Sequence, residues 1–218
     1  MSIFGLPRHR LYWSSATRVS QVADSMSRKR WEQIKKNLHF NNNENLPEDR
    51  NDVNRDKLFK LRPFLANLQQ KFANQVKPEK LCVDEQIVPF KGLSSLKQYN
   101  PKKPNKWGYK VFIACDRDGL IHNFEVYTGK ILPVPRKDDI GASGNIVLRL
   151  AAVIPKHKNH FLFFDNWFTS LKLLTTLYKD GIYSLGTIRK DRIHGLTFSS
   201  DNVMKKKGRA LTRSMKLP

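Results

Sequence analysis

The sequence predicts an α/β protein in which a mixed sheet, with the element order β-β-β-α-β-α-β, follows a helical N-terminal segment. Three observations support this prediction. From residue 79 onward, short apolar runs rich in β-formers alternate with turn residues, as is typical of strands. An Asp-Gly pair at 118–119 joins two of these runs and marks a hairpin. Two longer segments carry apolar residues at spacings of three and four, which indicates helices.

The first 78 residues are predicted to be mainly helical. Ser27 is placed to cap a helix through RKRWEQIKKNLHF. The apolar residues of this helix share one face: Trp31, Ile34 and Leu38. A second helix is predicted to begin near Arg62, because the proline that follows suits a first helical turn. This segment is either a plain support for the core or an arm that helps to grip a partner.

The core elements follow in order. The predicted strands are KLCVDEQIVPF (80–90), WGYKVFIACD (107–116), LIHNFEVYT (120–128), HFLFFD (160–165) and IYSLGTIRK (182–190). The predicted helices are GASGNIVLRLAAVI (141–154), with Ser143 or Asn145 as its cap, and WFTSLKLLTTLYKDG (167–181), which Gly181 ends. This order is that of the ribonuclease H-like fold.

Two aspartates occupy matching places in that order. Asp84 lies in the first strand and Asp165 ends the fourth. The first and fourth strands are neighbours in a ribonuclease H-like sheet, so we expect the two carboxylates to meet at one edge. Such a pair holds divalent metal, and hard oxygen ligands suit Mg²⁺. Glu85 is not expected to join, because adjacent strand residues point to opposite faces. A structural alternative has Asp165 capping the following helix and Asp84 pairing with a lysine.

The sequence resembles the piggyBac transposase family. The stretches that carry the resemblance are GLPRHRLYWS, MSRKRWEQIKKNLHF, RPFLANLQQKF, VDEQIVPFKG, WGYKVFIACDRDGLIHNFEVYTGK and FFDNWFTS. The resemblance implies a helical dimerisation and DNA-binding domain (1–78), a catalytic core (79–190), and a basic tail or the start of an insertion (191–218). It also implies that Asp84 and Asp165 are catalytic ligands of Mg²⁺ or Mn²⁺. It further implies double-stranded DNA with a TTAA-type target, a homodimer and a nuclear location.

One departure from the family pattern concerns its third aspartate, which lies on a later helix beyond an insertion. The later acids of this sequence do not match that position: Asp180, Asp191 and Asp201. The Cys/His zinc-binding domain of the family also has no counterpart here, and neither Cys82 nor Cys115 belongs to a CxxC pair. We therefore expect a fragment, a truncated element or a domesticated remnant that is inactive alone.

The chain carries 40 Lys and Arg against 19 Asp and Glu, a formal charge of +21. Such an excess favours nucleic acid as a partner. The residues expected to contact DNA phosphates are Lys97, Lys102, Lys103, Lys106, Arg189, Lys190 and Arg192. Tyr99 and Trp107 are interleaved with the lysines, and an aromatic ring can stack on an unpaired base. The alternative is a solvated loop with Trp107 turned into the core, and for Trp107 itself burial in the core is favoured because it directly precedes a strand.

Three further expectations concern class and location. The two cysteines lie in apolar runs and are interpreted as reduced thiols. No apolar run approaches 18 residues and MSIFGLPRHR lacks a signal-peptide core, so we expect a soluble intracellular protein that acts at no membrane. KKKGR at 205–209 is either a solvated basic segment or a nuclear-import or phosphate-binding motif. Two non-enzymatic alternatives remain open, a DNA-binding remnant and a basic RNA-binding or scaffolding protein.

Overall fold

A computed structural model describes residues 4–47, 49, 55–101, 103–188, 192 and 203. The chain divides into two compact units, Met1–Asn67 and Leu68–Pro218. The predicted exposed basic segment at 205–209 lies outside the described residues. Among the described residues, no helix is both long and apolar enough to cross a bilayer.

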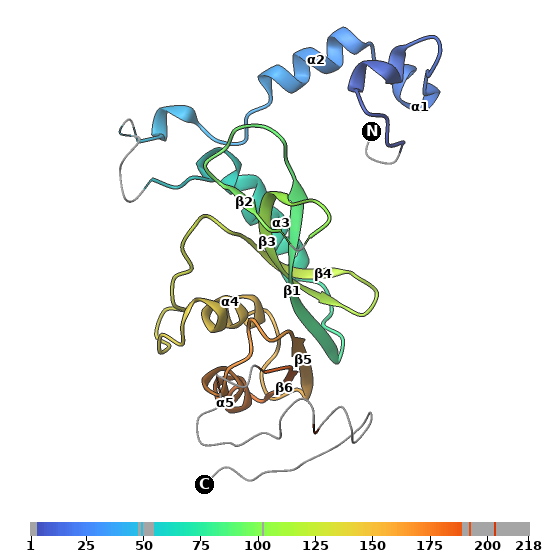
Figure 1. Ribbon diagram of the computed structural model, residues 1–218. Helices are drawn as coiled ribbons and strands as arrows, with labels where there is room; N and C mark the ends of the chain where they lie inside the picture. Colours follow the sequence, from blue (N-terminus) through green and yellow to red (C-terminus); the bar gives the residue numbers. More distant parts are fainter. Residues whose placement is uncertain are drawn as a thin grey trace. The chain divides into compact units, whose positions relative to one another are not determined.

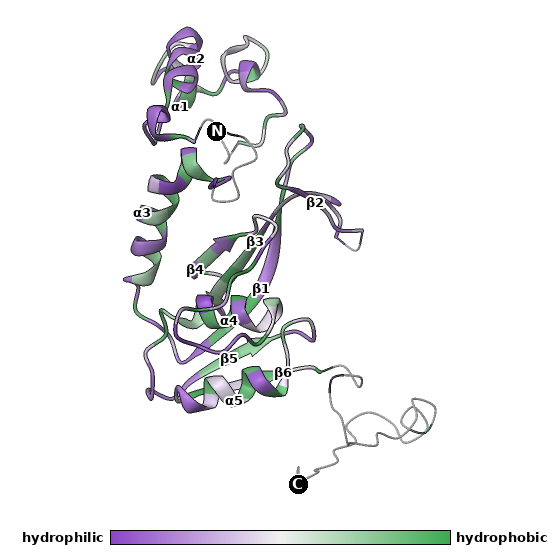
Figure 2. Cartoon of the chain, turned by 90° about the vertical axis from the view of Figure 1, so that its left-hand side faces the viewer, coloured by the Kyte–Doolittle hydropathy of each residue, from purple (hydrophilic) through white to green (hydrophobic). Residues whose placement is uncertain are grey.

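The first unit is built from short helices. These are η1 (His9–Trp13), α1 (Ser20–Ala23), α2 (Arg28–Asn37), η2 (Asn43–Asn45), η3 (Phe59–Leu61) and the start of α3 (Arg62–Ala73). Ser27 caps α2 as predicted, because its hydroxyl oxygen accepts a hydrogen bond from the Arg30 amide. Hydrophilic residues dominate α2 (Figure 2), and only a few aromatic contacts, such as His9 against Trp31 at 4.9 Å between ring centres, anchor it.

The second unit contains one six-stranded mixed sheet. Its strands are β1 (Lys80–Pro89), β2 (Lys97–Tyr99), β3 (Trp107–Asp116), β4 (Ile121–Val126), β5 (His160–Phe164) and β6 (Ile182–Gly186). The order along the sheet is β2-β3-β1-β5-β6, and β4 also pairs with β3. β1 pairs with β3 antiparallel and with β5 parallel, and β5 pairs with β6 parallel. Apart from the short β2, this is the predicted ribonuclease H-like order.

Two helices, α4 (Ala142–Ala151) and α5 (Leu171–Lys179), pack against this sheet (Figure 1). The core lies between them and the strands, and its centre includes Leu81, Val83, Phe112, Leu162 and Leu173. Strand residues of the core alternate along the chain, since one face of the sheet is buried. Neither predicted cap of α4 operates: Gly141 occupies the cap position without a side-chain bond, while Asn145 is buried and bonds to Asp139 and Ile140.

The two cysteines face each other across β1 and β3. Cys82 and Cys115 are register partners, their sulfurs are 3.3 Å apart, and both thiols are free and half-buried. Burial raises the pKa of Cys115 to about 12, because it disfavours the thiolate. The prediction of reduced, unreactive thiols is therefore consistent with their surroundings.

Candidate metal and nucleic-acid site

The parallel pairing of β1 and β5 brings the two predicted acids together. Val83 and Phe164 are the last register partners of this ladder. Asp84 and Asp165 are the residues that follow each of them, and both are exposed. The two carboxylates therefore lie at neighbouring positions of two adjacent strands, on the edge where β5 ends.

Local backbone bonds fix both acids. The Asp84 carboxylate accepts a hydrogen bond from the Glu85 amide at 2.8 Å. The Asp165 carboxylate accepts one from the Trp167 amide at 2.9 Å, which forms an Asx-type turn after the strand. Each bond engages one carboxylate oxygen, so the second oxygen of each aspartate can face a ligand.

The capping part of the structural alternative is wrong. The helix after β5 begins at Leu171 rather than at Trp167, and the Ser170 hydroxyl caps it by accepting from the Leu173 amide. Asp165 therefore shapes the turn but does not cap the helix. The nearby ion pair also goes elsewhere, since Lys103 lies 3.6 Å from the carboxylate of Glu85.

Glu85 and Lys110 form a charged pair beside the acids. Glu85 is paired in register with Phe112, a core residue, whereas Asp84 is paired with Ile113. The register places Asp84 and Glu85 at positions of β1 that face opposite ways. Burial raises the pKa of the Glu85 carboxyl, and the charges of Lys110 and Lys103 oppose that rise. The two carboxyl groups still interact, because the charge of Asp84 and a side-chain hydrogen bond with it also raise the pKa of Glu85. Burial likewise lowers the pKa of Lys110, while the charges of Glu85, Asp165 and Asp84 support its protonated form.

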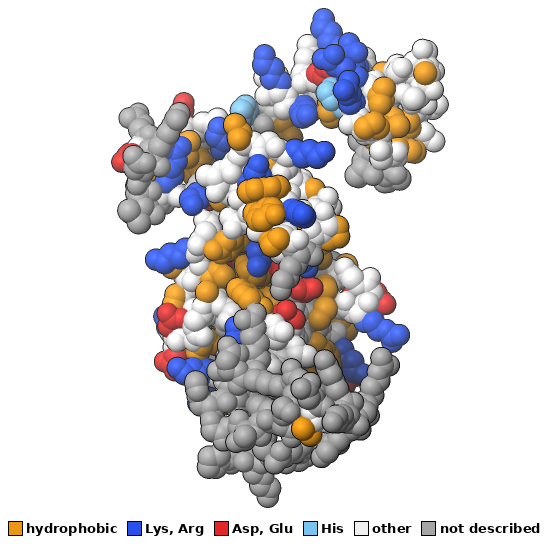
Figure 3. Space-filling view, in the orientation of Figure 1, with side chains coloured by type: hydrophobic (Ala, Val, Ile, Leu, Met, Phe, Trp, Pro, Cys, Tyr) orange, Lys and Arg blue, Asp and Glu red, His pale blue; other side chains and the backbone are white. Residues whose placement is uncertain are grey.

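The lysine-rich segment forms a basic surface around β2 and the start of β3. Figure 3 shows hydrophobic side chains there with Lys and Arg side chains around them. Tyr99 and Trp107 contact each other at 4.7 Å between ring centres, with their planes tilted by 45°, and are about half exposed, 52% and 50%. The ammonium of Lys97 lies 4.9 Å from the Trp107 ring. The alternative in which Trp107 enters the core is therefore wrong.

The other predicted DNA contacts have different environments. Lys106 is exposed, and Lys103 lies near Glu85. Lys102, Arg189 and Lys190 lie outside the described residues. Arg192 donates three hydrogen bonds of 2.9 Å to the carbonyls of Asn166, Trp167 and Thr169. This side chain thus supports the turn after Asp165, a contact that nothing in the local sequence pattern indicated.

The donor set of the acid pair fits a hard divalent cation. Asp84 and Asp165 offer carboxylate oxygens at one edge, which is the ligand type that Mg²⁺ prefers. Within the described part of the chain, no group of three or more His, Cys, Asp or Glu residues is placed to hold a metal ion. Any cation at this edge would therefore take its protein ligands from these two carboxylates.

Comparisons with known proteins agree with this arrangement. A family model described as Transposase IS4 matches residues 1–214. Human PiggyBac transposable element-derived protein 3 is 35% identical over 209 residues, which cover 94% of this chain and 34% of that protein. Human PiggyBac transposable element-derived protein 2 is 29% identical over 208 residues, covering 92% and 33%. The chain thus spans about a third of the length of these curated relatives.

A solved structure gives the fold independently. The cryo-EM structure of the piggyBac transposase synaptic complex with hairpin DNA matches with a TM-score of 0.71 at 21% identity. The match covers 92% of this chain and 40% of that one. With the family model spanning nearly the whole chain, this likeness confirms the ribonuclease H-like core. The chain belongs to the Transposase IS4 family, as a member of the piggyBac type.

Proposed function

We propose that this chain is the DNA-binding and metal-binding part of a DDE-type transposase core. The observation that carries the proposal is the parallel register of β1 and β5, which sets Asp84 and Asp165 side by side within the same unit as the lysine-rich surface. In a protein of this family, the lysines would hold the DNA backbone, and a phosphodiester bond would be cut at the two aspartates. Residues 1–78 would serve dimerisation and DNA binding.

Asp84 and Asp165 would hold Mg²⁺ or Mn²⁺ through their free carboxylate oxygens. A divalent ion in such a site activates water and stabilises the leaving oxygen of a phosphodiester. The chain's own contribution is positional: the Asx-type turn at Asp165 and the Glu85 amide bond at Asp84 keep both carboxylates in place. Well-placed groups matter because in-line attack tolerates little displacement.

The partner is double-stranded DNA, gripped mainly through phosphates. The lysines of the basic surface carry this contact, chiefly Lys97, Lys103 and Lys106, and phosphate contacts supply affinity rather than sequence readout. Labelled duplex titrated between low and physiological salt tests this proposal. We expect affinity to fall steeply with salt, and each of Lys97→Ala and Lys106→Ala to reduce the log–log slope by about 0.9.

Two controls sharpen the DNA-binding test. Lys179→Ala removes the same charge from α5, outside the basic surface, and is expected to leave the slope unchanged. A duplex RNA of the same length separates DNA binding from the rival class of basic RNA-binding proteins. Affinity that does not change with salt, or that is higher for RNA, would contradict the proposal.

Strand cleavage is not expected from the 218-residue chain alone. Two carboxylates without a third acidic ligand in the described residues fix two ions poorly. The assay is a plasmid with piggyBac-type transposon ends, incubated with the purified chain and Mg²⁺ or Mn²⁺. Nicking that disappears in Asp84→Asn and Asp165→Asn would show that the chain is active. Nicking that persists in both variants would show that neither aspartate is needed for cleavage.

Three features of the relatives are extended to this chain as part of the proposal. The chain would act in the nucleus, favour TTAA-type targets and work as a homodimer. Its similarity to a transposase solved with hairpin DNA supports DNA as the partner. A non-enzymatic DNA-binding role is the alternative, and it predicts the same salt dependence without any metal-dependent nicking.

A further inference from the structure

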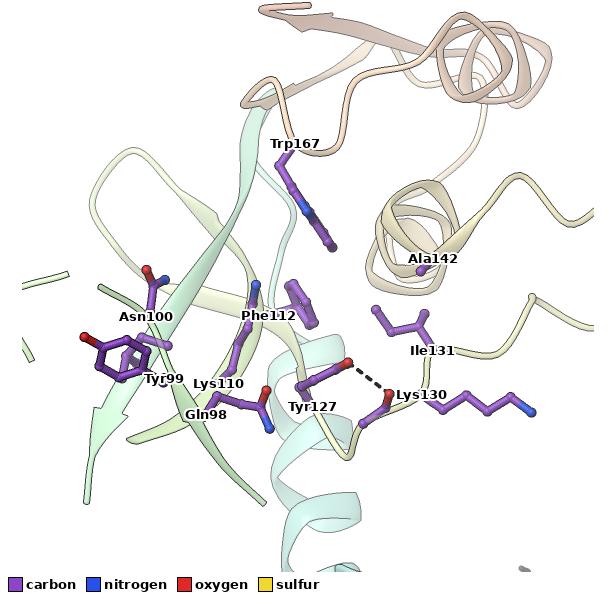
Figure 4. A pocket seen from close by; sticks show the side chains of 12 residues that line it. Gln98, Tyr99, Asn100, Lys110, Phe112, Tyr127, Lys130, Ile131, Ala142 and Trp167 are labelled. Atoms are coloured by element: carbon purple, nitrogen blue, oxygen red, sulfur yellow. Dashed lines mark hydrogen bonds between the residues drawn. The ribbon is translucent and has the colours of Figure 1, made fainter. Parts of the chain in front are cut away.

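A cavity of about 430 Å³ lies in the second unit, between the sheet and the segment that leads into α4 (Figure 4). Its walls come from β2, β3, the segment 127–131, the start of α4 and the turn after β5. Its volume is within the range of about 300–1,000 Å³ that is usual for small-ligand pockets. Nothing in the proposed metal-binding or phosphate-binding role uses this cavity.

Aromatic rings form much of the cavity wall. Trp167 and Phe112 lie nearly parallel, with 5.7 Å between ring centres and 14° between planes. Tyr127 meets Phe112 edge to face at 6.0 Å, and Tyr99 contributes a further ring. Figure 4 shows Trp167 reaching from the turn after β5 toward Phe112 on β3. Flat aromatic walls of this kind favour a flat aromatic ligand.

Polar groups at the same cavity are few and suited to a heterocycle with hydrogen-bonding edges. The Lys110 ammonium lies 4.7 Å from the Phe112 ring centre and 4.8 Å from that of Trp167. Gln98 lines the cavity, and its amide nitrogen reaches carbonyls only at 3.4 and 3.5 Å, so a better partner can displace these contacts. An amide and an ammonium offer both donors and an acceptor to a ligand edge.

Two residues connect this cavity with the acid pair. Trp167 forms part of the wall, and its amide binds the Asp165 carboxylate at 2.9 Å. Lys110 forms part of the wall, and its ammonium lies 4.8 Å from the ring centre of Trp167, two residues after Asp165. A nucleotide whose phosphate lies at the acid pair therefore has an aromatic cavity within reach of its base.

We propose that this cavity holds one unpaired nucleobase of the bound DNA, stacked on Trp167, while the adjoining phosphate lies at Asp84 and Asp165. The inference rests on the proposed function, because it needs DNA at the acid pair. Enzymes that bend or open a duplex pay for unstacking a base and recover that cost in an aromatic pocket. A base held in the cavity would anchor the reacting strand and limit its sliding past the acids.

The test compares two duplexes of equal length in the presence of Mg²⁺, because a phosphate at the acid pair needs the cation and the chain alone is not expected to cleave. One is fully paired, and the other carries a single bulged 2-aminopurine, whose fluorescence falls when it stacks on an aromatic ring. We expect the bulged duplex to bind the full chain about tenfold more tightly, as one stacked base allows. We also expect its fluorescence to be quenched on binding.

Trp167→Ala is expected to abolish both the preference and the quenching, with the affinity for paired duplex unchanged. Trp167→Phe is expected to keep part of each. Tyr183→Ala removes an exposed ring of the β5–β6 ladder and serves as the matched control that changes neither. Circular dichroism checks the fold of each variant. If Trp167→Ala does not fold, Gln98→Ala takes its place, and an unchanged preference in that variant counts against the pocket.

The outcomes separate the two proposals. Equal affinity of the parent chain for both duplexes overturns the base pocket and leaves duplex binding intact. A preference that persists in folded Trp167→Ala, or that is lost in Trp107→Ala instead, also overturns it, because the base would then lie elsewhere. A parent chain that binds neither duplex overturns the proposed function, and the pocket with it.

Discussion

Divalent metal should stabilise this chain modestly, and only while both aspartates are present. Each carboxylate gives one oxygen to a backbone amide, Asp84 to Glu85 and Asp165 to Trp167. That leaves about one oxygen from each aspartate for a cation, so the remaining ligands would be water. Such a site belongs with the weakest protein sites for divalent ions, with a Kd of about 1 mM.

The size of the effect follows from mass action. At 10 mM Mg²⁺ a Kd of about 1 mM adds roughly 1.4 kcal/mol to the free energy of unfolding, from RT ln 11. For a chain of this length, roughly 1.4 kcal/mol corresponds to a rise in Tm of about 3–6 °C. Thermal unfolding followed by circular dichroism measures it, with NaCl at matched ionic strength as the reference because the chain is strongly basic.

Asp84→Asn and Asp165→Asn are each expected to remove the Mg²⁺-dependent rise in Tm. Asparagine keeps a side-chain oxygen for the backbone bond, so the Tm without metal should change little. Asp118→Asn, in the β3–β4 hairpin, removes the same charge elsewhere and should leave the rise intact. A rise that survives in the Asp84 and Asp165 variants, or that falls equally in Asp118→Asn, would refute the acid pair as the metal site.

Three stability predictions follow from other contacts. Gly108→Ala should cost about 3 kcal/mol in a denaturant titration, since the new Cβ would lie 2.2 Å from the Val88 carbonyl oxygen on the paired strand; an unchanged midpoint would contradict the pairing. Ser27→Ala should lower the helical signal of the first unit by removing the α2 cap, a loss of about 1 kcal/mol, whereas Ser27→Asp should preserve it. Asp180 bonds to Lys137 at 2.5 Å and Lys156 at 2.8 Å. Burial acts to raise the pKa of Asp180, but these two lysines together hold it below its usual value. Its stabilisation is therefore present above about pH 4 and lost as the pH falls through the folded-state pKa, so Asp180→Asn should cost about 1 kcal/mol at pH 7 and almost nothing near pH 2.

Local patterns predicted the sheet well because strand signals here are strong and close together. The bounds of β3 match the predicted stretch 107–116, and the Asp-Gly hairpin lies where expected, with Gly119 at a positive φ of 83°. β2 was not predicted, because its three residues are too few to show the alternation of apolar and polar side chains that indicates a strand. The helix after β5 begins late because Asp165 and Ser170 each bind backbone amides and hold the stretch between them as a turn.

The candidate site, too, was predictable from the sequence only in part. The meeting of Asp84 and Asp165 follows from strand order, which the order of the predicted elements indicated. The contacts of Arg192 with the turn 166–169, and the approach of Trp167 to Phe112, join residues far apart in sequence. No local periodicity encodes such contacts. Trp107 shows the converse: its position before a strand favoured burial, but its ring contacts that of Tyr99 and is half exposed.

The proposed function requires a chain of net charge +21 to present two exposed acids to DNA. Two adjacent carboxylates repel each other and repel an approaching phosphate. Lys110 counters part of both effects, since it lies half-buried beside Trp167 and interacts with the charges of Asp84, Glu85 and Asp165. Burial lowers the pKa of Lys110, and the charges of the three acids oppose that fall. In the proposed function, the acids at this edge would bind a divalent cation while the surrounding lysines attract the DNA backbone.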